Sequence, residues 1–300
     1  MTTISIPYND YFSFQECHRY LDRNQNDCLY SIGEKSIRKA LKIRGKSIIA
    51  DISEMDHSLR VKIIAGSITP EMEKEVRSYV IDWFDPERDI SPFYQLLKKQ
   101  DRLAYMVSDF SGLRLLGIPN LFEALCWCII GQQINLAFAH KVKRSLVEKY
   151  GEKIDFENNT FYLFPSYNVI ARLNIDELRS MQFSIQKARY MITVAQAFSS
   201  GEISRENIVA LPDLPARQEL LLSLKGVGIW TANYVLMKCL RELTCIPYGD
   251  AGLLNALTRH SIIEKKSDSK TIDKFFAHFP GWESYMVFYL WRSLSRPGKN

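Results

Sequence analysis

The sequence predicts an α+β protein in which a small antiparallel-sheet domain, residues 1–90, precedes a larger all-helical domain, residues 91–300. Residues 47–66 alternate apolar and polar side chains, are rich in Ile and Val, and contain a turn near 56–58, which is typical of an antiparallel β-hairpin. After residue 90 the apolar residues recur at helical spacing, and only FYLF (161–164) has the pattern of a strand. A chain of 300 residues is long enough for two domains.

The expected helices follow from apolar periodicity and from the residues at their ends. Residues 12–23 have apolar side chains at helical spacing. A helix is predicted over 69–84, because Thr69 can cap it, Pro70 suits its first turn and Asp85-Pro86 ends it. The later expected helices span 91–98, 101–110, 120–131, 134–150, 168–181, 186–199, 215–223, 227–241, 250–261, 270–279 and 281–295.

The composition excludes several classes of protein. Hydrophobic residues make up 46% of the chain and charged residues 24%, which is ordinary for a soluble globular protein. No apolar run approaches the roughly 18 residues of a membrane span, and the N-terminus lacks the pattern of a signal peptide, so we expect a cytoplasmic protein with no membrane partner. The six cysteines show no Cys-x-x-Cys spacing, which favours free thiols over a zinc or iron–sulfur site.

The positive charge gathers in the C-terminal third. The whole chain has a formal net charge of +5, and residues 222–300 contain eleven Lys and Arg against six Asp and Glu. A basic segment favours a polyanionic partner such as nucleic acid. A slightly basic, solvated surface explains the same count equally well.

A glycine turn between two expected helices carries the most specific signal. Gly226 and Gly228 flank Val227 in LKGVGIWTANYVL (224–236), and both glycines can adopt positive φ. A helix that starts at Val227 would present free amides beside Lys225, an arrangement that binds phosphate oxygens without reading base sequence. Taken alone, the same turn also fits a plain αα-hairpin in which a glycine ends the first helix.

Two aromatic residues and one acid follow this turn. Trp230 and Tyr234 are four residues apart and share one helix face, where aromatic rings can hold an extruded base. Asp250 stands alone in the otherwise uncharged segment PYGDAGLLNAL (247–257). Simpler interpretations are two core aromatic residues and a helix N-cap. Each simpler interpretation is favoured on its own, but turn, aromatic pair and acid together, at this spacing, form a more specific pattern.

These stretches resemble the helix–hairpin–helix DNA glycosylase superfamily, most closely its 3-methyladenine DNA glycosylase II branch, which repairs alkylated DNA. The glycine turn followed by IPYGDAGLL resembles its signature. FEALCWCIIGQQINLAFAHKVKRSLVEKYG (122–151) resembles the family's first domain-spanning helix pair, and WESYMVFYLW (282–291) resembles its C-terminal helix. Residues 1–90 resemble more loosely the antiparallel-sheet domain shared with the 8-oxoguanine glycosylases. The resemblance therefore implies a sheet domain followed by a helix–hairpin–helix glycosylase domain.

The resemblance implies roles for individual residues. Asp250 matches the catalytic aspartate, and the matches to the base pocket are Trp230, Tyr234 and Trp291. Ala251 stands where some relatives have a tyrosine, which implies a wider or less aromatic pocket.

The resemblance also implies a DNA-binding surface. Gln133 occupies the position of the wedge that enters the duplex, where some relatives have leucine. The residues that match the DNA-gripping hairpin are Leu224, Lys225, Gly226, Val227 and Gly228. An alkali cation at the hairpin is implied on the main-chain carbonyls of Leu222, Leu224 and Val227.

Departures from the superfamily pattern define the expected reaction. Bifunctional members carry a lysine where this chain has Trp230, and iron–sulfur members carry four cysteines after the acid, where this chain has none. The resemblance thus implies a monomeric, monofunctional enzyme with no required cofactor and no iron–sulfur cluster.

The implied reaction is hydrolysis of the N-glycosidic bond of alkylated purines, such as 3-methyladenine and 7-methylguanine, in damaged double-stranded DNA. This first step of base excision repair leaves an abasic site. The alternatives are an 8-oxoguanine-type or other lesion glycosylase, and a non-catalytic DNA-binding module. The motifs do not rank the alkylated and deaminated bases as substrates.

Overall fold

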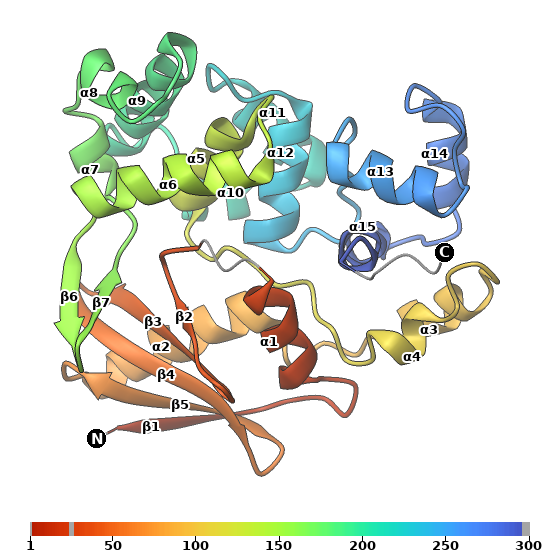
Figure 1. The fold of residues 1–300 in the computed structure, drawn as a ribbon, viewed down its shortest axis with the longest axis horizontal. Helices are drawn as coiled ribbons and strands as arrows, with labels where there is room; N and C mark the ends of the chain where they lie inside the picture. Colours follow the sequence, from red (N-terminus) through yellow and green to blue (C-terminus); the bar gives the residue numbers. More distant parts are fainter. Residues whose placement is uncertain (1, 24–26, 296–300) are drawn as a thin grey trace.

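The computed structural model describes residues 2–23 and 27–295, and its N-terminal part is a five-stranded antiparallel sheet (Figure 1). The elements are β1 (Thr3–Pro7), α1 (Phe14–Asp22), β2 (Ser31–Ile32), β3 (Ser36–Ile43), β4 (Lys46–Met55) and β5 (Ser58–Ala65). The strand order is β1-β5-β4-β3-β2. The predicted hairpin is confirmed as β4 and β5, with Met55 opposite Ser58. Asp56 and His57 both have positive φ, which suits a tight turn between twisted strands.

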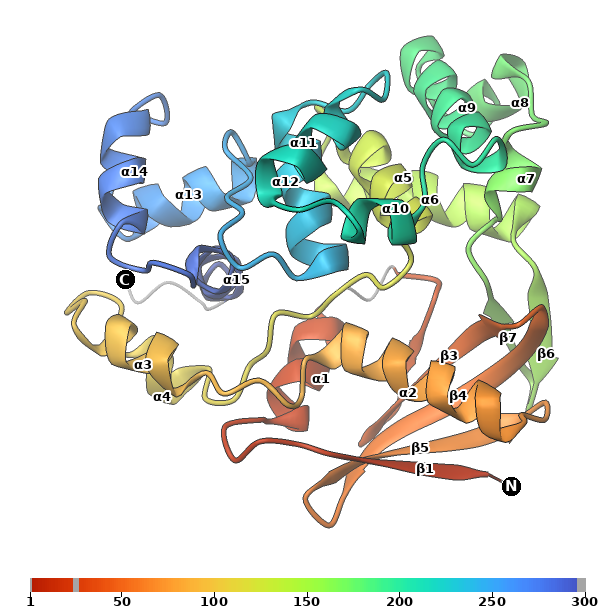
Figure 2. The same cartoon turned by 180° about the vertical axis from the view of Figure 1, so that it is seen from behind.

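A long helix, α2 (Pro70–Phe84), packs against one face of this sheet (Figure 2). The predicted cap is confirmed, because the Thr69 hydroxyl accepts from the amide of Met72 at 3.4 Å. The helix ends at Asp85, which adopts the left-handed conformation with φ 49°. Its apolar stripe includes Val76 and Val80, both fully buried, so burial of one face explains its position.

The rest of the chain is mostly helical, and the predicted fold class is confirmed (Figures 1 and 2). α15 lies between α13 and α1, and most of its side chains are buried. The helices are α3 (Ser91–Lys98), α4 (Met106–Asp109), α5 (Leu121–Gly131), α6 (Leu136–Tyr150), α7 (Tyr167–Ile170), α8 (Ile175–Arg179), α9 (Ile185–Ser199), α10 (Arg205–Val209), α11 (Leu214–Leu222), α12 (Ile229–Val235), the π-helix η1 (Leu236–Leu240), α13 (Ala251–Arg259), α14 (Ser269–Phe276) and α15 (Glu283–Ser293). Within the described ranges, every helix is too short or too polar to cross a membrane.

Two expected helices were wrong in extent. The expected helix 101–110 is only the four-residue α4 preceded by turns. The expected helix 168–181 is two short helices, α7 and α8, because Asn174 and Glu177 form a capping box that starts a new helix.

The expected strand 161–164 lies two residues earlier, as β7 (Asn159–Tyr162). It pairs with β6 (Lys153–Phe156), which was not expected. Phe161 and Leu163 pack with Ala40 and Ile49 of the N-terminal sheet, so this hairpin covers the second face of that sheet. The larger domain is therefore not entirely helical. The domain boundary near residue 90 stays a prediction.

Candidate active site

Asp250 is held by three N–H donors at the start of α13. Its Oδ1 accepts from the amide of Leu253 at 2.7 Å, so the N-cap interpretation describes the local structure correctly. The same oxygen accepts from Trp291 Nε1 at 2.9 Å, and Oδ2 accepts from Trp230 Nε1 at 3.3 Å. Gly252 leaves room for this arrangement, since a Cβ there would lie 3.3 Å from Trp291 Cδ1 and 3.1 Å from Oδ1. The carboxylate therefore has one fixed orientation.

The three expected pocket residues lie in a row beside Asp250. The ring centroids of Trp230 and Tyr234 are 5.7 Å apart, and those of Tyr234 and Trp291 are 5.8 Å apart. Both indoles turn their N–H edges toward the carboxylate. Besides their ring faces, the two indoles therefore contribute hydrogen bonds to Asp250, a role that the sequence pattern does not indicate.

Further aromatic side chains pack behind this row. Trp127 Nε1, from α5, donates to the hydroxyl oxygen of Tyr234 at 3.2 Å. Tyr20 of α1 packs on Phe288 with ring centroids 4.4 Å apart, and Phe288 lies 6.4 Å from Trp291. Sequence patterns do not distinguish these three from ordinary core residues, because an aromatic residue in a helix is usually buried in the core.

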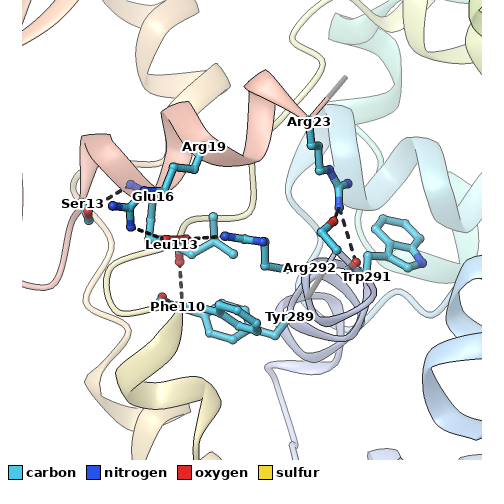
Figure 3. Close-up of polar contacts among 10 residues, drawn as sticks. Ser13, Glu16, Arg19, Arg23, Phe110, Leu113, Tyr289, Trp291 and Arg292 are labelled. Atoms are coloured by element: carbon cyan, nitrogen blue, oxygen red, sulfur yellow. Dashed lines mark hydrogen bonds and ion pairs between the residues drawn. The ribbon is translucent and has the colours of Figure 1, made fainter. Parts of the chain in front are cut away.

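The N-terminal domain holds α15, the helix that carries Trp291 (Figure 3). Arg23 of α1 donates to the main-chain carbonyl of Trp291 at 3.4 Å. Next to it, Arg292 forms an ion pair with the buried Glu16 at 3.2 Å. On the same helix, Tyr289 donates from its hydroxyl to main-chain carbonyls of the segment before α5, that of Leu113 at 3.0 Å and that of Phe110 at 3.2 Å. α1 is therefore part of the support of the pocket.

The glycine turn has a different geometry from the one expected. Gly226 does adopt positive φ (93°), but Gly228 has φ −97°, so only the first glycine needs that freedom. The amide of Val227 is not free, because it donates to the Leu224 carbonyl at 3.0 Å and closes the turn. α12 begins at Ile229 instead, with Gly228 as its N-cap. The amides of Gly228 and Ile229 have no acceptor among the described residues.

Gln133 and the glycine turn lie on one surface depression of about 380 Å³. Gln133 is exposed and adopts φ 56° just after α5. Its neighbour Gln132 donates from Nε2 to the Gly226 carbonyl at 3.1 Å, which ties the two turns together. The lining residues are Gln132, Gln133, Ser184, Gln186, Lys187, Tyr190, Gly226, Val227 and Gly228.

Three apolar side chains close in sequence to residues that line this depression are about half exposed. They are Leu136, Ile185 and Ile229, each at the start of a helix. Sequence reasoning missed them, since an apolar residue at a helix start normally indicates burial.

The hairpin carbonyls suit an alkali cation. The carbonyls of Leu222 and Val227 accept no hydrogen bond from the residues that the structure describes. The Leu224 carbonyl accepts one, from Val227, and its second lone pair is open. Oxygen ligands of this kind suit hard cations. The cation itself stays a prediction.

All six cysteines are free thiols, five of them buried.

Comparison with known proteins identifies the family. Residues 126–279 match the family described as HhH-GPD superfamily base excision DNA repair protein, and residues 7–125 match the N-terminal domain of 8-oxoguanine DNA glycosylase. A DNA-3-methyladenine glycosylase of Bacillus subtilis (strain 168) is 37% identical over 278 residues, which cover 92% of this chain and 91% of that protein.

Solved structures agree with this fold. A 3-methyladenine DNA-glycosylase from Archaeoglobus fulgidus superposes with a TM-score of 0.82 at 20% identity, covering 97% of this chain and 98% of that one. An 8-oxoguanine glycosylase/lyase of Clostridium acetobutylicum gives a TM-score of 0.74 at 18% identity, covering 97% and 95%. The resemblance inferred from the sequence is confirmed: this chain belongs to the HhH-GPD superfamily of base excision DNA repair proteins.

Proposed function

We propose that this protein is a monofunctional DNA glycosylase that releases alkylated purines, such as 3-methyladenine and 7-methylguanine, from double-stranded DNA. The observation that carries the proposal is the Asp250 carboxylate, fixed by three N–H donors beside a row of three aromatic rings. The 37% identical relative bears the name of a 3-methyladenine glycosylase, which supports this substrate class.

We assign DNA binding to the depression that Gln133 and the glycine turn line together. The amides of Gly228 and Ile229 face a phosphate of the backbone, and Lys225 adds a positive charge beside them. A nucleotide must leave the base stack to reach Asp250, which costs a few kcal/mol. Gln133, exposed on its turn, fills the gap in the duplex and offsets part of that cost.

The aromatic row binds the extruded base. Many alkylated purines are cationic, and a cation over an aromatic face gains about 0.5–2 kcal/mol. A cationic base is also a good leaving group, so one carboxylate and no separate general acid is sufficient. The sugar develops oxocarbenium character as the bond breaks, and Asp250 stabilises this charge at a fixed position. Water then completes hydrolysis, which leaves a free base and an abasic site.

Strand cleavage would need an amine that forms a Schiff base with the sugar. Trp230 stands where bifunctional relatives carry that lysine. Lys238, two turns further along, is buried, donates to the Leu116 carbonyl and lies 4.6 Å over the Phe288 ring. This amine is engaged behind the aromatic row, so we propose that the reaction stops at the abasic site.

A panel of lesion duplexes tests the proposal. Purified protein is incubated with duplexes that contain 7-methylguanine, 3-methyladenine, hypoxanthine or 8-oxoguanine, and the released bases are quantified. Release of the methylated purines is expected. Release of 8-oxoguanine alone favours the second lesion class, a possibility raised by the fold shared with 8-oxoguanine glycosylase/lyases. If the protein binds the duplexes but releases no base from any of them, it is a non-catalytic DNA-binding module.

A further inference from the structure

Trp127 lies behind the aromatic row, and the reaction described above does not use its polar atom. Its Nε1 is 3.2 Å from the hydroxyl oxygen of Tyr234. An indole N–H can only donate, so the Tyr234 oxygen is the acceptor in this bond. The hydroxyl proton of Tyr234 must therefore point away from Trp127.

This proton is available to a ligand. Burial raises the pKa of Tyr234 well above its usual range, so the phenol keeps its proton under physiological conditions. Across residues 2–23 and 27–295, no acceptor for the proton is found. A half-buried donor without an acceptor is unfavourable. A base that brings a nitrogen or carbonyl oxygen lone pair to this point would satisfy it.

The surroundings of Trp127 fix the direction of its N–H group. The His140 ring packs on it with centroids 4.8 Å apart, and Lys143 Nζ lies 5.5 Å from the ring centroid. Lys143 is itself buried and held by two carboxylates, Asp27 at 3.1 Å and Glu123 at 3.5 Å. These contacts restrict the rotation of the Trp127 ring. The N–H group of Trp127 is therefore directed at Tyr234 before any base binds.

We propose that Trp127 is a positioning residue that makes the Tyr234 hydroxyl a hydrogen-bond donor to the base in the pocket. This inference rests on the proposed function, because it needs a base beside Asp250. It adds a specificity element: the faces of Trp230 and Trp291 respond to the charge of the base, whereas Tyr234 responds to an acceptor atom on its edge. The favoured ligands are purines with a ring nitrogen or carbonyl oxygen at that edge.

A spectroscopic test examines the hydrogen bond without any activity. The chain has five tryptophans, so ¹⁵N-tryptophan labelling gives five indole N–H resonances. The resonance that Trp127→Phe removes belongs to Trp127. In Tyr234→Phe this resonance should move and its proton should exchange faster with water. An unmoved resonance would overturn the proposal even if the protein proves to be an active glycosylase.

A double-mutant cycle tests the role in the reaction. Single-turnover release of 7-methylguanine is measured for wild type, Trp127→Phe, Tyr234→Phe and the double variant. Each single change should slow release by about 3- to 10-fold, and the double variant should match Tyr234→Phe, since Trp127 acts only through the hydroxyl that Tyr234→Phe already lacks. Trp282→Phe, nine residues before Trp291 on the chain, is the matched control and should leave the rate unchanged.

Two outcomes are then distinct. If Trp127→Phe slows release as much in the Tyr234→Phe background as in wild type, Trp127 acts only through packing and the positioning role is wrong. If wild type releases no base from any duplex, the proposed function fails, and the indole resonance still reports whether the hydrogen bond exists.

Discussion

The two glycines of the hairpin should respond to substitution in opposite ways. Gly226 has φ 93°, and a Cβ there would lie 2.3 Å from Cγ of Tyr190. The left-handed backbone costs a non-glycine residue roughly 1–2 kcal/mol, and overpacking costs typically 1–3 kcal/mol. Gly226→Ala should therefore lower the free energy of unfolding by about 2–5 kcal/mol, a large part of the total stability of a domain.

Gly228 has φ −97°, and a Cβ there would meet nothing within 4 Å. Gly228→Val should thus change stability by less than about 1 kcal/mol. Its side chain would cover the amides that we assign to a DNA phosphate, so DNA affinity should fall by about tenfold, for damaged and undamaged duplexes alike.

Urea unfolding and fluorescence anisotropy with labelled duplexes separate these effects. Wild-type affinity should also fall steeply with salt, because phosphate contacts release counterions. If Gly226→Ala is as stable as wild type, the turn differs from the one in this structure. Undiminished binding of undamaged DNA by Gly228→Val would show that the hairpin does not approach the backbone.

Three further predictions concern the pocket. Trp291→Phe keeps an aromatic face but loses the N–H group that donates to Asp250, so it should slow release of 7-methylguanine and hypoxanthine alike. Trp291→Ala also loses the aromatic face, so it should slow release of the cationic 7-methylguanine more than release of the neutral hypoxanthine. Equal losses in Trp291→Ala would mean that the ring serves mainly as packing. Borohydride should trap no covalent complex with lesion DNA. Efficient trapping would refute the monofunctional assignment, and its loss in Lys238→Met would identify Lys238 as the amine. Burial lowers the pKa of Lys238 to about 7, so the folded state gives up this proton earlier than the unfolded state. Stability should then rise between about pH 7 and pH 10, by up to roughly 1.4 kcal/mol per pH unit from this group, and Lys238→Met should flatten the rise in urea midpoints.

The regular elements were predictable where local signals were strong. The helix that Thr69 caps and the hairpin with its turn at Asp56 and His57 follow from residues close in sequence. The β6–β7 hairpin was not predictable to its full extent, because its apolar residues Phe161 and Leu163 are buried by a sheet more than a hundred residues earlier. Periodicity contains no information on such a distant partner.

The candidate site was predictable as a set of residues but not as a geometry. Asp250, Trp230 and Trp291 were expected together, yet the bonds from both indole N–H groups to the carboxylate depend on how α12 and α15 lie against the start of α13. Both hairpin glycines could adopt positive φ, and only the folded turn, closed by the bond from Val227 to Leu224, shows that Gly226 alone of the two does so. The role of Trp127 was not predictable, because this residue lies in an apolar helix and only the fold brings it to Tyr234.

Asp250→Asn tests the central claim most directly. Asparagine is as good an N-cap as aspartate, so α13 should persist, while the change removes the charge and the oxygen that accepts from Trp230. We expect release of 7-methylguanine to slow by at least about 100-fold, with DNA affinity and melting temperature close to those of wild type. Release at nearly the wild-type rate, in a variant that folds and binds DNA normally, would show that Asp250 only caps a helix and would contradict the account.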